Sequence, residues 1–567
     1  MVPYSVLIAE AIILALLGPA FLYVLFCIWV YRTSRRLRTP PDGYESYLRE
    51  AVNAGMRTLP LDLEENKKRI FRRFLILASK KPSNYSSNAP GLVLQDVPKK
   101  APFRFKFSKE GEIVDRKVIF GFFHPYASAG GGGERVLWAA VRQTLDNHPH
   151  NVCAIYIGAE NSGLIETPRA IVEKVKARFG IEVDFDRVVF IYLRKRRLVD
   201  PATWPRFTLL GQAIGSAMLA YEALNQLVPD VMVDTMGLPF SYPIFSWLAQ
   251  IPIAAYVHYP VVSSDMLKKI PKTSFKQIYW RLLMWAYGYV LGKYCPMMMT
   301  NSTWTNNHIR SLVKPFFTRP DLVTIVYPPC AVQDFEPPTE DQARKPTIVY
   351  IAQFRPEKRH ELLLREFAKF VKDYEVPVGA PKPHLLLIGS VRNDDDKQRV
   401  YSLRLLSREL ELGDDYVTFM LDAPWAQVSP FLRSSSIGVN AMWNEHFGMV
   451  IVEYMAAGLI PVAHNSAGPK MDIVTPEDNR PGLLYVSSED PDYDPNRDHK
   501  ALSMSDCFGQ IMTMSPEQSF EKRLAAYEAA QRFSDEVFAK AWDIRVNALI
   551  KLDKLKRRKR MLSRLFD

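Results

Sequence analysis

Two series of short apolar runs, separated by stretches with helical spacing, dominate the pattern of hydrophobic and polar positions along the chain. Alternation of buried strands with helices is typical of parallel sheets joined by crossover helices. We therefore predict an α/β protein with two Rossmann-like domains facing each other across a cleft. The first series lies at residues 117–123, 151–157, 188–193, 230–234 and 253–257, and the second at 347–352, 384–388, 416–420, 437–440, 459–463 and 482–486.

A proline-bearing stretch at residues 327–346 separates the two series and predicts the interdomain linker. Ligands of such folds bind in the crevice at the carboxyl ends of the strands, so we expect the site in the cleft. The predicted divisions are an anchor with a basic flank at 1–38, a tether with peripheral helices at 39–115, a first, acceptor-side domain at 116–335, a second, donor-binding domain at 336–530, and a C-terminal helix with a basic tail at 531–567.

Residues 4–31 are apolar apart from one charged side chain, Glu10, and predict an N-terminal transmembrane helix. A cleaved signal peptide would have a basic start and a shorter apolar core, whereas here the basic residues follow the apolar run. Arg32, Arg35, Arg36 and Arg38 place the rest of the chain on the cytoplasmic side by the positive-inside rule.

The net charge of +12 raises the question of a nucleic-acid partner. The arginines at 32–38 and the basic residues at 551–564, set against Asp553, account for a surplus of eleven, so the rest of the chain is close to neutral. This distribution favours contact with anionic headgroups over nucleic acid, although solvated helix faces explain the tail equally well. The five cysteines lack C-x-x-C spacing and predict neither a disulfide framework nor a zinc site.

Glu445 and Glu453 are candidate ligand-binding residues in the second domain. Glu445 lies on the loop that enters a predicted helix, and Glu453 lies about two turns further along it. Between them, the backbone N–H groups of Phe447, Gly448 and Met449 are the unpaired donors of a helix start, which suit a sugar hydroxyl or a phosphate. Two carboxylates at this spacing are, by themselves, more often a solvated helix face.

Arg355 and Lys358 follow the first strand of the second domain and bring two positive charges to the carboxyl edge of its sheet. There they would hold a diphosphate and stabilise it as it leaves, although a basic loop alone is usually only a loop. The acidic run 394–396 falls in a predicted polar, solvated loop, so we expect neither a metal ion nor another cofactor.

In the first domain, His258 closes a strand at the same sheet edge, either as a satisfied hydrogen-bonding residue or as a catalyst. The glycine loop Gly130, Gly131, Gly132 and Gly133 leads into a helix with its N–H groups toward the cleft, with a structural turn as the alternative. It lacks the G-x-G-x-x-G dinucleotide fingerprint. The aromatic segment 275–294 fits an interfacial membrane helix and a buried core helix about equally well.

The segment 444–458 resembles the E-x7-E motif of the retaining GT-B glycosyltransferases over its whole length. In that family the first Glu contacts the donor sugar and the second the nucleotide ribose, which implies these roles for Glu445 and Glu453. The resemblance also implies that Arg355 and Lys358 clamp the donor diphosphate, and that His258 approaches the donor sugar from the acceptor domain.

Further blocks are similar to one branch of these enzymes, the GDP-mannose-dependent α-1,2-mannosyltransferases of dolichol-linked oligosaccharide assembly. They lie at 124–126, 130–138, 233–237, 256–260, 301–305, 354–358 and 464–470, with Ala467 departing from an expected Gly. The resemblance implies two successive transfers from GDP-mannose to trimannosyl-chitobiosyl diphospho-dolichol. It implies a single-pass protein of the endoplasmic reticulum membrane facing the cytosol, with other mannosyltransferases of the pathway as candidate partners.

Three alternatives remain open at this point. The first is that the chain is a cytosolic α-1,3 or α-1,6 mannosyltransferase of the same pathway. The second is that it is a catalytically inactive GT-B membrane scaffold. Nucleic-acid binding by the basic tail is disfavoured by the neutral body.

Overall fold

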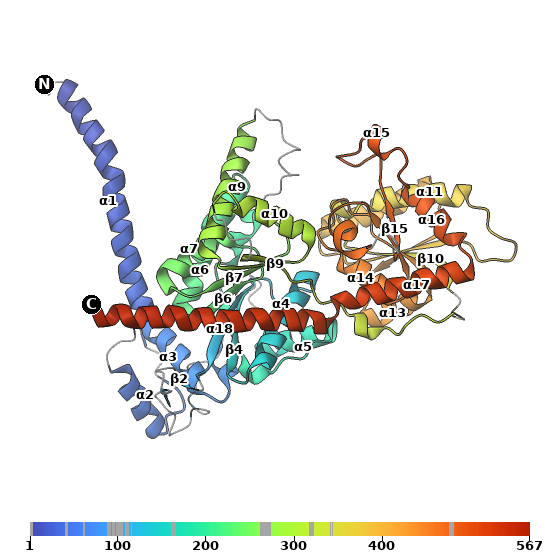
Figure 1. Cartoon of the computed structure of the whole chain (residues 1–567). Coiled ribbons are helices and arrows are strands. Elements are labelled where there is room, and N and C mark those ends of the chain that lie inside the picture. Colours follow the sequence, from blue (N-terminus) through green and yellow to red (C-terminus); the bar gives the residue numbers. More distant parts are fainter. Residues whose placement is uncertain are drawn as a thin grey trace.

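Two parallel β-sheets, each covered by helices, lie side by side and are bridged by a long C-terminal helix (Figure 1). The structure is a computed structural model. It describes residues 4–39, 43–59, 63–87, 116–159, 166–260, 274–316, 322–340, 344–475 and 481–566, with isolated positions between 92 and 114 and at 342. Side chains at 4–20 and 560–566 lie outside this description.

The first sheet has seven parallel strands in the order β5-β4-β3-β6-β7-β8-β9 within the described residues. The five apolar runs predicted for this domain all coincide with strands, whereas β8 and β9 were not predicted. The strands are β3 (Val118–Phe123), β4 (Asn151–Gly158), β5 (Val188–Leu193), β6 (Val231–Asp234), β7 (Ile253–Val257), β8 (Met297–Thr300) and β9 (Val323–Ile325), and the main helices are α4 (Gly132–Asn147), α5 (Pro168–Phe179), α6 (Thr208–Gln226), α9 (Phe275–Tyr294) and α10 (Thr303–Val313).

The second sheet has six parallel strands in the order β12-β11-β10-β13-β14-β15, counted over the same described ranges. All six predicted runs coincide with these strands. They are β10 (Lys345–Ile351), β11 (His384–Gly389), β12 (Val417–Leu421), β13 (Ser435–Val439), β14 (Ile460–His464) and β15 (Leu483–Tyr485), and the main helices are α11 (His360–Asp373), α12 (Asp394–Glu409), α13 (Trp425–Ser434), α14 (Met449–Ala456), α16 (Met504–Met512) and α17 (Pro516–Ala530). Two parallel, helix-covered sheets confirm the predicted architecture.

Burial on both faces explains why the strands appear in the sequence as continuous apolar runs. Every residue of β3, β4 and β5 is buried. Alternate side chains of β3 enter separate cores on the two faces of the sheet, with Ile119 and Phe123 on one side and Phe120 and Phe122 on the other.

The acidic run 394–396 forms the first turn of α12 and not a solvated loop, so that expectation was wrong. The Asn393 side chain caps the helix by accepting a hydrogen bond from the backbone N–H of Asp396 at 2.9 Å. Three carboxylates in a first turn are stabilised there by the positive end of the helix dipole. Asp396 itself is buried.

The N-terminal region consists of α1 (Tyr4–Arg38), α2 (Tyr44–Asn53) and α3 (Glu65–Ala78). Among the helices whose side chains are described, none is both long and apolar enough to cross a membrane. The predicted anchor at 4–31 includes positions 4–20, whose side chains lie outside that description. Part of its basic flank binds the first domain, since Arg36 donates to the Tyr221 hydroxyl at 3.0 Å and Arg38 to Gln250 at 2.9 Å.

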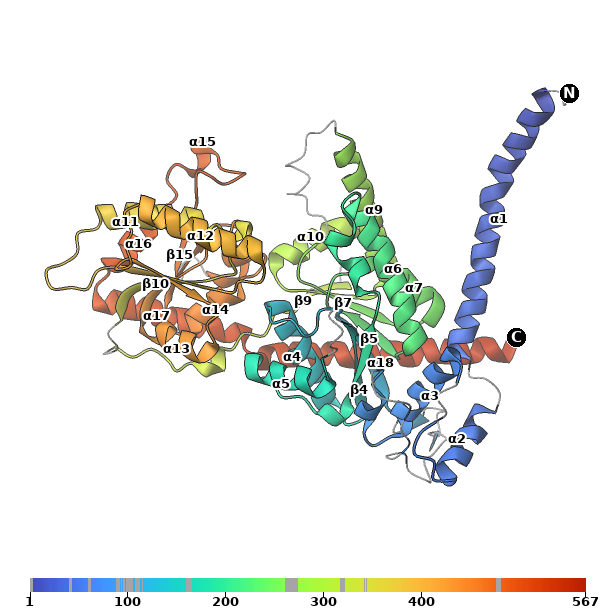
Figure 2. The ribbon, with the colours of Figure 1, turned by 180° about the vertical axis from the view of Figure 1, so that it is seen from behind.

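The C-terminal helix α18 (Asp535–Phe566) leaves the second domain and runs back along the first, as both views show (Figures 1 and 2). Trp542 is buried, stacks on Phe538 and donates its indole N–H to the Thr144 hydroxyl at 2.9 Å. At the start of the helix, Asp535 pairs with Arg135 of α4 at 3.0 Å. These contacts join segments about 400 residues apart in the sequence.

Trp542→Ala is expected to lower the free energy of unfolding of the first domain by about 3–5 kcal/mol, because it leaves a large cavity and removes the hydrogen bond that the Thr144 hydroxyl accepts. Chemical unfolding followed by circular dichroism measures the change. Ile544→Ala on the same helix is the matched control, since Ile544 is 60% exposed, and it should alter stability by less than about 0.5 kcal/mol. Equal losses in the two variants would contradict the role of α18 as a clamp.

Candidate active site

Glu445 and Lys358 form a close ion pair at the carboxyl edge of the second sheet. Lys358 Nζ donates to Glu445 Oε2 at 2.7 Å, and the two side chains are 24% and 14% exposed. Burial alone raises the pKa of Glu445, but the charge and hydrogen bond of Lys358 outweigh it, and the pKa lies below its usual range. Glu445 is therefore a carboxylate that accepts hydrogen bonds, and Lys358 is a cation held at the same point.

Arg355 lies at the start of the same short loop but is more open to solvent. Its side chain is 42% exposed, and its nearest acid, Glu357, is 3.9 Å away. An exposed guanidinium with only a long ion pair is available to an incoming anion. The structure thus brings Lys358 to Glu445 directly and leaves Arg355 beside Lys358, more open to solvent.

The start of helix α14 supplies backbone donors next to this pair. Gly448 precedes the helix with φ +102°, a conformation that favours glycine. The backbone N–H groups of Phe447, Gly448 and Met449 donate no hydrogen bond to the described residues. Unpaired donors at a helix start combine with the helix dipole and suit anions and hydroxyls. Ligand binding by this segment stays a prediction.

Glu453 lies further along α14, half-buried between the two domains. Burial, reinforced by Asp334 and opposed by the positive charge of Arg135, raises its pKa to about 7. Its environment differs from that of Glu445, which has a cationic partner at 2.7 Å. Near neutral pH, Glu445 is therefore ionised, whereas Glu453 is present in both its protonated and its ionised form.

His258 follows β7 and faces the glycine loop at the start of α4. Its Nε2 is buried and has no hydrogen-bond partner among the described residues. A Cβ atom at Gly133 would lie 3.7 Å from that nitrogen, an ordinary van der Waals contact, so the glycine loop and the imidazole are direct neighbours. Burial and the neighbouring His124 lower the pKa of His258 to about 4, so the ring is neutral.

Glu134 fixes the glycine loop from within α4. One of its carboxylate oxygens accepts from the Gly131 N–H at 2.6 Å, and the other lies 3.3 Å from His124 Nε2. His124 in turn bonds the Thr235 hydroxyl at 2.8 Å through Nδ1. Hydrogen bonds from Glu134 and His124 thus hold the glycine loop at the start of α4 in place. The side-chain amide of Asn301 adds support to the His258 strand by donating to the His258 carbonyl at 3.0 Å.

A buried hydrogen-bond network joins the two loops that carry Lys358 and Glu445. Asp490, 1% exposed, accepts from Arg359 Nη1 at 2.6 Å and contacts His464 Nε2 at 2.7 Å. His464 Nδ1 bonds the Ser466 hydroxyl at 2.7 Å, and that hydroxyl accepts from the Asn444 N–H at 3.0 Å. The chain of contacts therefore begins next to Lys358 and ends next to Glu445.

Asn444 and Ala467 adopt the left-handed conformation, with φ of +53° and +44°. This conformation explains why glycine was expected at position 467, since a Cβ there costs about 1–2 kcal/mol. The adjacent Gly468 cannot be replaced, because a Cβ would lie 2.5 Å from the His446 carbonyl oxygen. Its N–H donates to the Glu445 carbonyl at 3.0 Å, so the 464–470 block holds the Glu445 loop in place.

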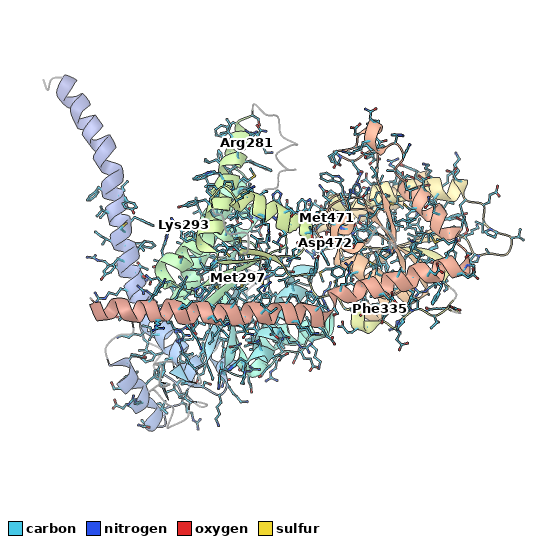
Figure 3. The ribbon with its side chains drawn as sticks, in the orientation of Figure 1. Arg281, Lys293, Met297, Phe335, Met471 and Asp472 are labelled. Carbon is cyan, nitrogen blue, oxygen red and sulfur yellow. The ribbon has the colours of Figure 1, made fainter. Side chains whose placement is uncertain are left out.

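Side chains of the two domains contact each other beside the Glu445 loop. Asp472 of the second domain accepts hydrogen bonds from the Thr303 N–H and hydroxyl and from the Tyr327 hydroxyl. Figure 3 shows Met471 and Asp472 at the junction of the two domains. His446, the neighbour of Glu445, lies between the rings of Tyr259 and Trp304, with centroid distances of 4.6 and 4.9 Å.

Sequence reasoning did not identify Asp490, Asp472 or Glu134 as supporting residues. The blocks 301–305 and 464–470 had been singled out by resemblance without roles, and the structure shows that both support the motif residues. Within the described part of the chain, no cluster of three or more His, Cys, Asp or Glu side chains is arranged to hold a metal ion.

A helix start, an ion pair and a basic loop at the edge of one of two Rossmann-like sheets are the features of a GT-B glycosyltransferase. Residues 333–493 match the family described as "Glycosyl transferases group 1". Among solved structures, the chain resembles "Trehalose-6-phosphate from E. coli bound with UDP-2-fluoro glucose" with a TM-score of 0.55 and 11% identity over 76% of this chain and 98% of that one. It also resembles sucrose-phosphate synthase from Thermosynechococcus elongatus, with a TM-score of 0.52 and 16% identity over 77% and 100%.

Residues 117–313 match a second family model, "ALG11 mannosyltransferase N-terminus". The chain is 41% identical to the GDP-Man:Man(3)GlcNAc(2)-PP-Dol alpha-1,2-mannosyltransferase of Yarrowia lipolytica, over 99% of this chain and 96% of that protein. It is 40% identical to the Homo sapiens protein of the same description, over 76% and 86%. The chain belongs to this ALG11 family of α-1,2-mannosyltransferases.

Asp490→Ala is expected to lower kcat/KM for mannosyl transfer at least about tenfold and to cost about 3 kcal/mol of stability, because it removes the close partner of the Arg359 charge, 2.6 Å away, and leaves, among the described residues, only the exposed Glu489 at 4.0 Å. Initial rates and chemical unfolding measure the two effects. Glu489→Ala is the matched control: Glu489 is 59% exposed and only 4.0 Å from Arg359, so its loss should be worth less than about 0.5 kcal/mol. Normal activity in Asp490→Ala would show that the network does not position the site.

Proposed function

We propose that the chain transfers two α-1,2-linked mannoses in succession from GDP-mannose to trimannosyl-chitobiosyl diphospho-dolichol. The observation that carries this proposal is the Glu445–Lys358 pair, 2.7 Å apart beside the open N–H groups that begin α14. At one helix start, such a site offers carboxylate oxygens that accept hydrogen bonds from sugar hydroxyls. It also offers N–H donors and a cation that bind a diphosphate. The relatives carry the donor and the acceptor in their descriptions.

Each motif residue has a role suited to its surroundings. Glu445 accepts hydrogen bonds from the mannose hydroxyls, and Glu453 accepts from the ribose hydroxyls. Lys358, Arg355 and the N–H groups of Phe447, Gly448 and Met449 bind the diphosphate. When the donor enters, Lys358 exchanges part of its contact with Glu445 for the phosphate oxygens, so that the negative charge developing on the leaving group meets a preorganised cation.

Retention of configuration is proposed to proceed by front-face displacement. The acceptor hydroxyl oxygen forms its bond to the mannose C1 on the face from which GDP departs, the bond from C1 to the phosphate oxygen breaks, and the hydroxyl proton passes to the departing diphosphate. His258, a neutral imidazole with an unpartnered Nε2, binds the donor sugar from the opposite domain without contributing a charge. Neutralisation by Arg355 and Lys358 makes a metal ion unnecessary in this scheme.

The membrane arrangement is part of the same proposal. The apolar run at 4–31 anchors α1 in the membrane of the endoplasmic reticulum, and the arginines at 32–38 keep the two domains on the cytosolic side. Support comes from the sequence pattern and from the dolichol in the relatives' descriptions.

Purified full-length protein, incubated with GDP-mannose and the Man3 lipid-linked acceptor, is expected to add two hexoses by mass, equally with and without chelator. Acceptors with one, two or four mannoses separate this activity from α-1,3 or α-1,6 transfer, because only the Man3 and Man4 forms should react. A single addition, a requirement for metal or a β-linked product by NMR would each refute a stated part of the proposal.

Glu445→Gln should abolish transfer, whereas the exposed Glu357→Gln should retain it.

GDP is expected to bind about tenfold more tightly at pH 8 than at pH 6, because a ribose hydroxyl binds the carboxylate form of Glu453 and its pKa is about 7. In the free protein, the effect of Glu453 on stability has the opposite dependence on pH: stability falls as the pH rises, whereas GDP affinity increases. The raised pKa favours the protonated carboxyl, so this contribution to stability is present below the unfolded pKa and is lost as the pH rises through about 7.

Isothermal titration of GDP across this pH range in wild type and Glu453→Gln tests the assignment. The neutral amide has no proton to lose, so the variant should bind with little pH dependence of this origin. A pH profile identical in wild type and variant would show that Glu453 does not carry the ribose contact.

A further inference from the structure

Helix α6 exposes an apolar stripe to the outside of the first domain. Phe207, at the helix start, and Leu210, Ile214 and Met218 are 57%, 43%, 50% and 42% exposed. Their spacing of three or four positions places them on one helical face. The opposite face of the helix, including Leu219, is buried against the sheet. An amphipathic surface helix buries its apolar stripe, whereas α6 is apolar on both faces.

Helix α9 shows the same arrangement. Phe275, Ile278, Leu282 and Trp285 are 71%, 63%, 64% and 57% exposed and again follow a spacing of three or four positions. Other apolar residues of α9, among them Leu283 and Leu291, are buried. The sequence left open whether residues 275–294 form a core helix or an interfacial one, and the structure shows a helix with one core face and one exposed apolar face.

The two exposed stripes belong to one surface. Phe207 packs edge-on against Tyr279 with ring centroids 5.5 Å apart, and the Tyr279 hydroxyl accepts from the Leu210 N–H at 3.0 Å. Figure 2 shows α6 and α9 side by side. We call this surface the α6–α9 ridge, and it consists of Phe207, Leu210, Ile214, Met218, Phe275, Ile278, Leu282 and Trp285. An exposed contiguous apolar surface of this kind marks an interaction site.

The ridge is bordered by positive charge. Arg206 directly precedes Phe207, and Lys276 and Arg281 lie on α9 between its exposed apolar residues, whereas α9 has no acidic residue. Figure 3 places Arg281 toward the outer end of α9 and Lys293 toward α1. The chain between its termini is close to neutral in total charge, but the residues beside the ridge are locally basic.

The ridge continues toward α1, whose apolar side chains at 21–26 are exposed. Phe26 of α1 packs edge-on against Trp247 at 5.5 Å, and Trp247 against Tyr294 at the end of α9 at 5.8 Å. Trp29 lies 6.1 Å from Tyr221 of α6. The amino-terminal ends of α1 and α9 point to the same side of the molecule in both views (Figures 1 and 2).

We propose that the α6–α9 ridge is a second membrane contact, which inserts its apolar side chains among the headgroups of an anionic lipid bilayer. Aromatic and aliphatic side chains with a lysine and arginine border are the composition of helices that lie in the membrane interface. The ridge holds the first domain against the bilayer independently of α1. The proposal rests on the proposed function in one respect: the contact brings the acceptor-side domain to a lipid-linked substrate.

Site-specific fluorescence in vesicles containing anionic lipid tests the contact. The chain has one exposed cysteine, Cys27, and four buried ones, all within the described residues. In a Cys27→Ser background, an environment-sensitive label at Ile214→Cys or Leu282→Cys should gain at least about twofold in emission on vesicles and be quenched by nitroxide lipids. Labels at Val378→Cys and Ile544→Cys, at exposed positions on the second domain and on α18, are the matched controls and should stay accessible to a water-soluble quencher.

Labels at 214 and 282 that behave like those at 378 and 544 would overturn the proposal. A rise in emission that follows protein concentration without vesicles would also overturn it, since it would assign the ridge to a second copy of the chain. Flotation of the labelled protein with the vesicles reports on the α1 anchor separately.

Transfer assays give a second readout. Ile214→Asp and Leu282→Asp should lower transfer to a long-chain lipid acceptor in vesicles about tenfold, equivalent to roughly 1.4 kcal/mol, and leave transfer to a short-chain soluble acceptor unchanged. Val378→Asp should affect neither acceptor. Equal losses on both acceptors would refute the membrane role. Absence of transfer in wild type would refute the proposed function, while the labels would still report the membrane contact.

Discussion

The geometry of the candidate site around Glu445 and Lys358 depends on the buried carboxylate of Asp490. A charge removed from water must be paired and hydrogen-bonded, and Asp490 meets this requirement with Arg359, His464 and the Ser487 N–H. Although burial alone raises its pKa, these partners outweigh that effect and hold the pKa below its usual range. Because Arg359 follows Lys358, and Ser466 extends the contact to Asn444, the pairing fixes both sides of the Glu445–Lys358 contact at once.

Three of the seven described non-glycine residues with positive φ lie around the same loops. Arg359, Asn444 and Ala467 have positive φ without being glycine, and each lies in or beside the network that Asp490 organises. Such conformations persist only where the surroundings determine them, and they cluster at ligand sites. The Asp490 network stabilises these conformations. It thereby holds the start of α14 and the Lys358 side chain, both of which lie against Glu445.

Local features of the site were predictable from the sequence, and distant ones were not. Strand ends and the helix after Glu445 follow from hydrophobic periodicity, which placed Glu445, Lys358 and His258 at the edges of their sheets. The Arg359–Asp490 pair spans 131 residues and the Trp542–Thr144 bond 398, and no periodicity encodes such pairings. The run 394–396 was assigned to a loop because its composition was considered without the capping side chain of Asn393.

The ridge shows why the hydrophobic pattern of residues 275–294 did not decide between a core helix and an interfacial helix. A helix that is apolar on two opposite faces has no clear amphipathic pattern, so the sequence of 275–294 fits a core helix and an interfacial helix alike. Only the packing shows which face the sheet already covers. The glycine loop and His258 belong to the domain that carries the ridge, whereas Glu445 and Lys358 belong to the other. A ridge seated on a bilayer would therefore fix the first domain relative to the lipid surface. The second domain stays joined to it through the Asp472 and His446 contacts and the Arg135–Asp535 pair.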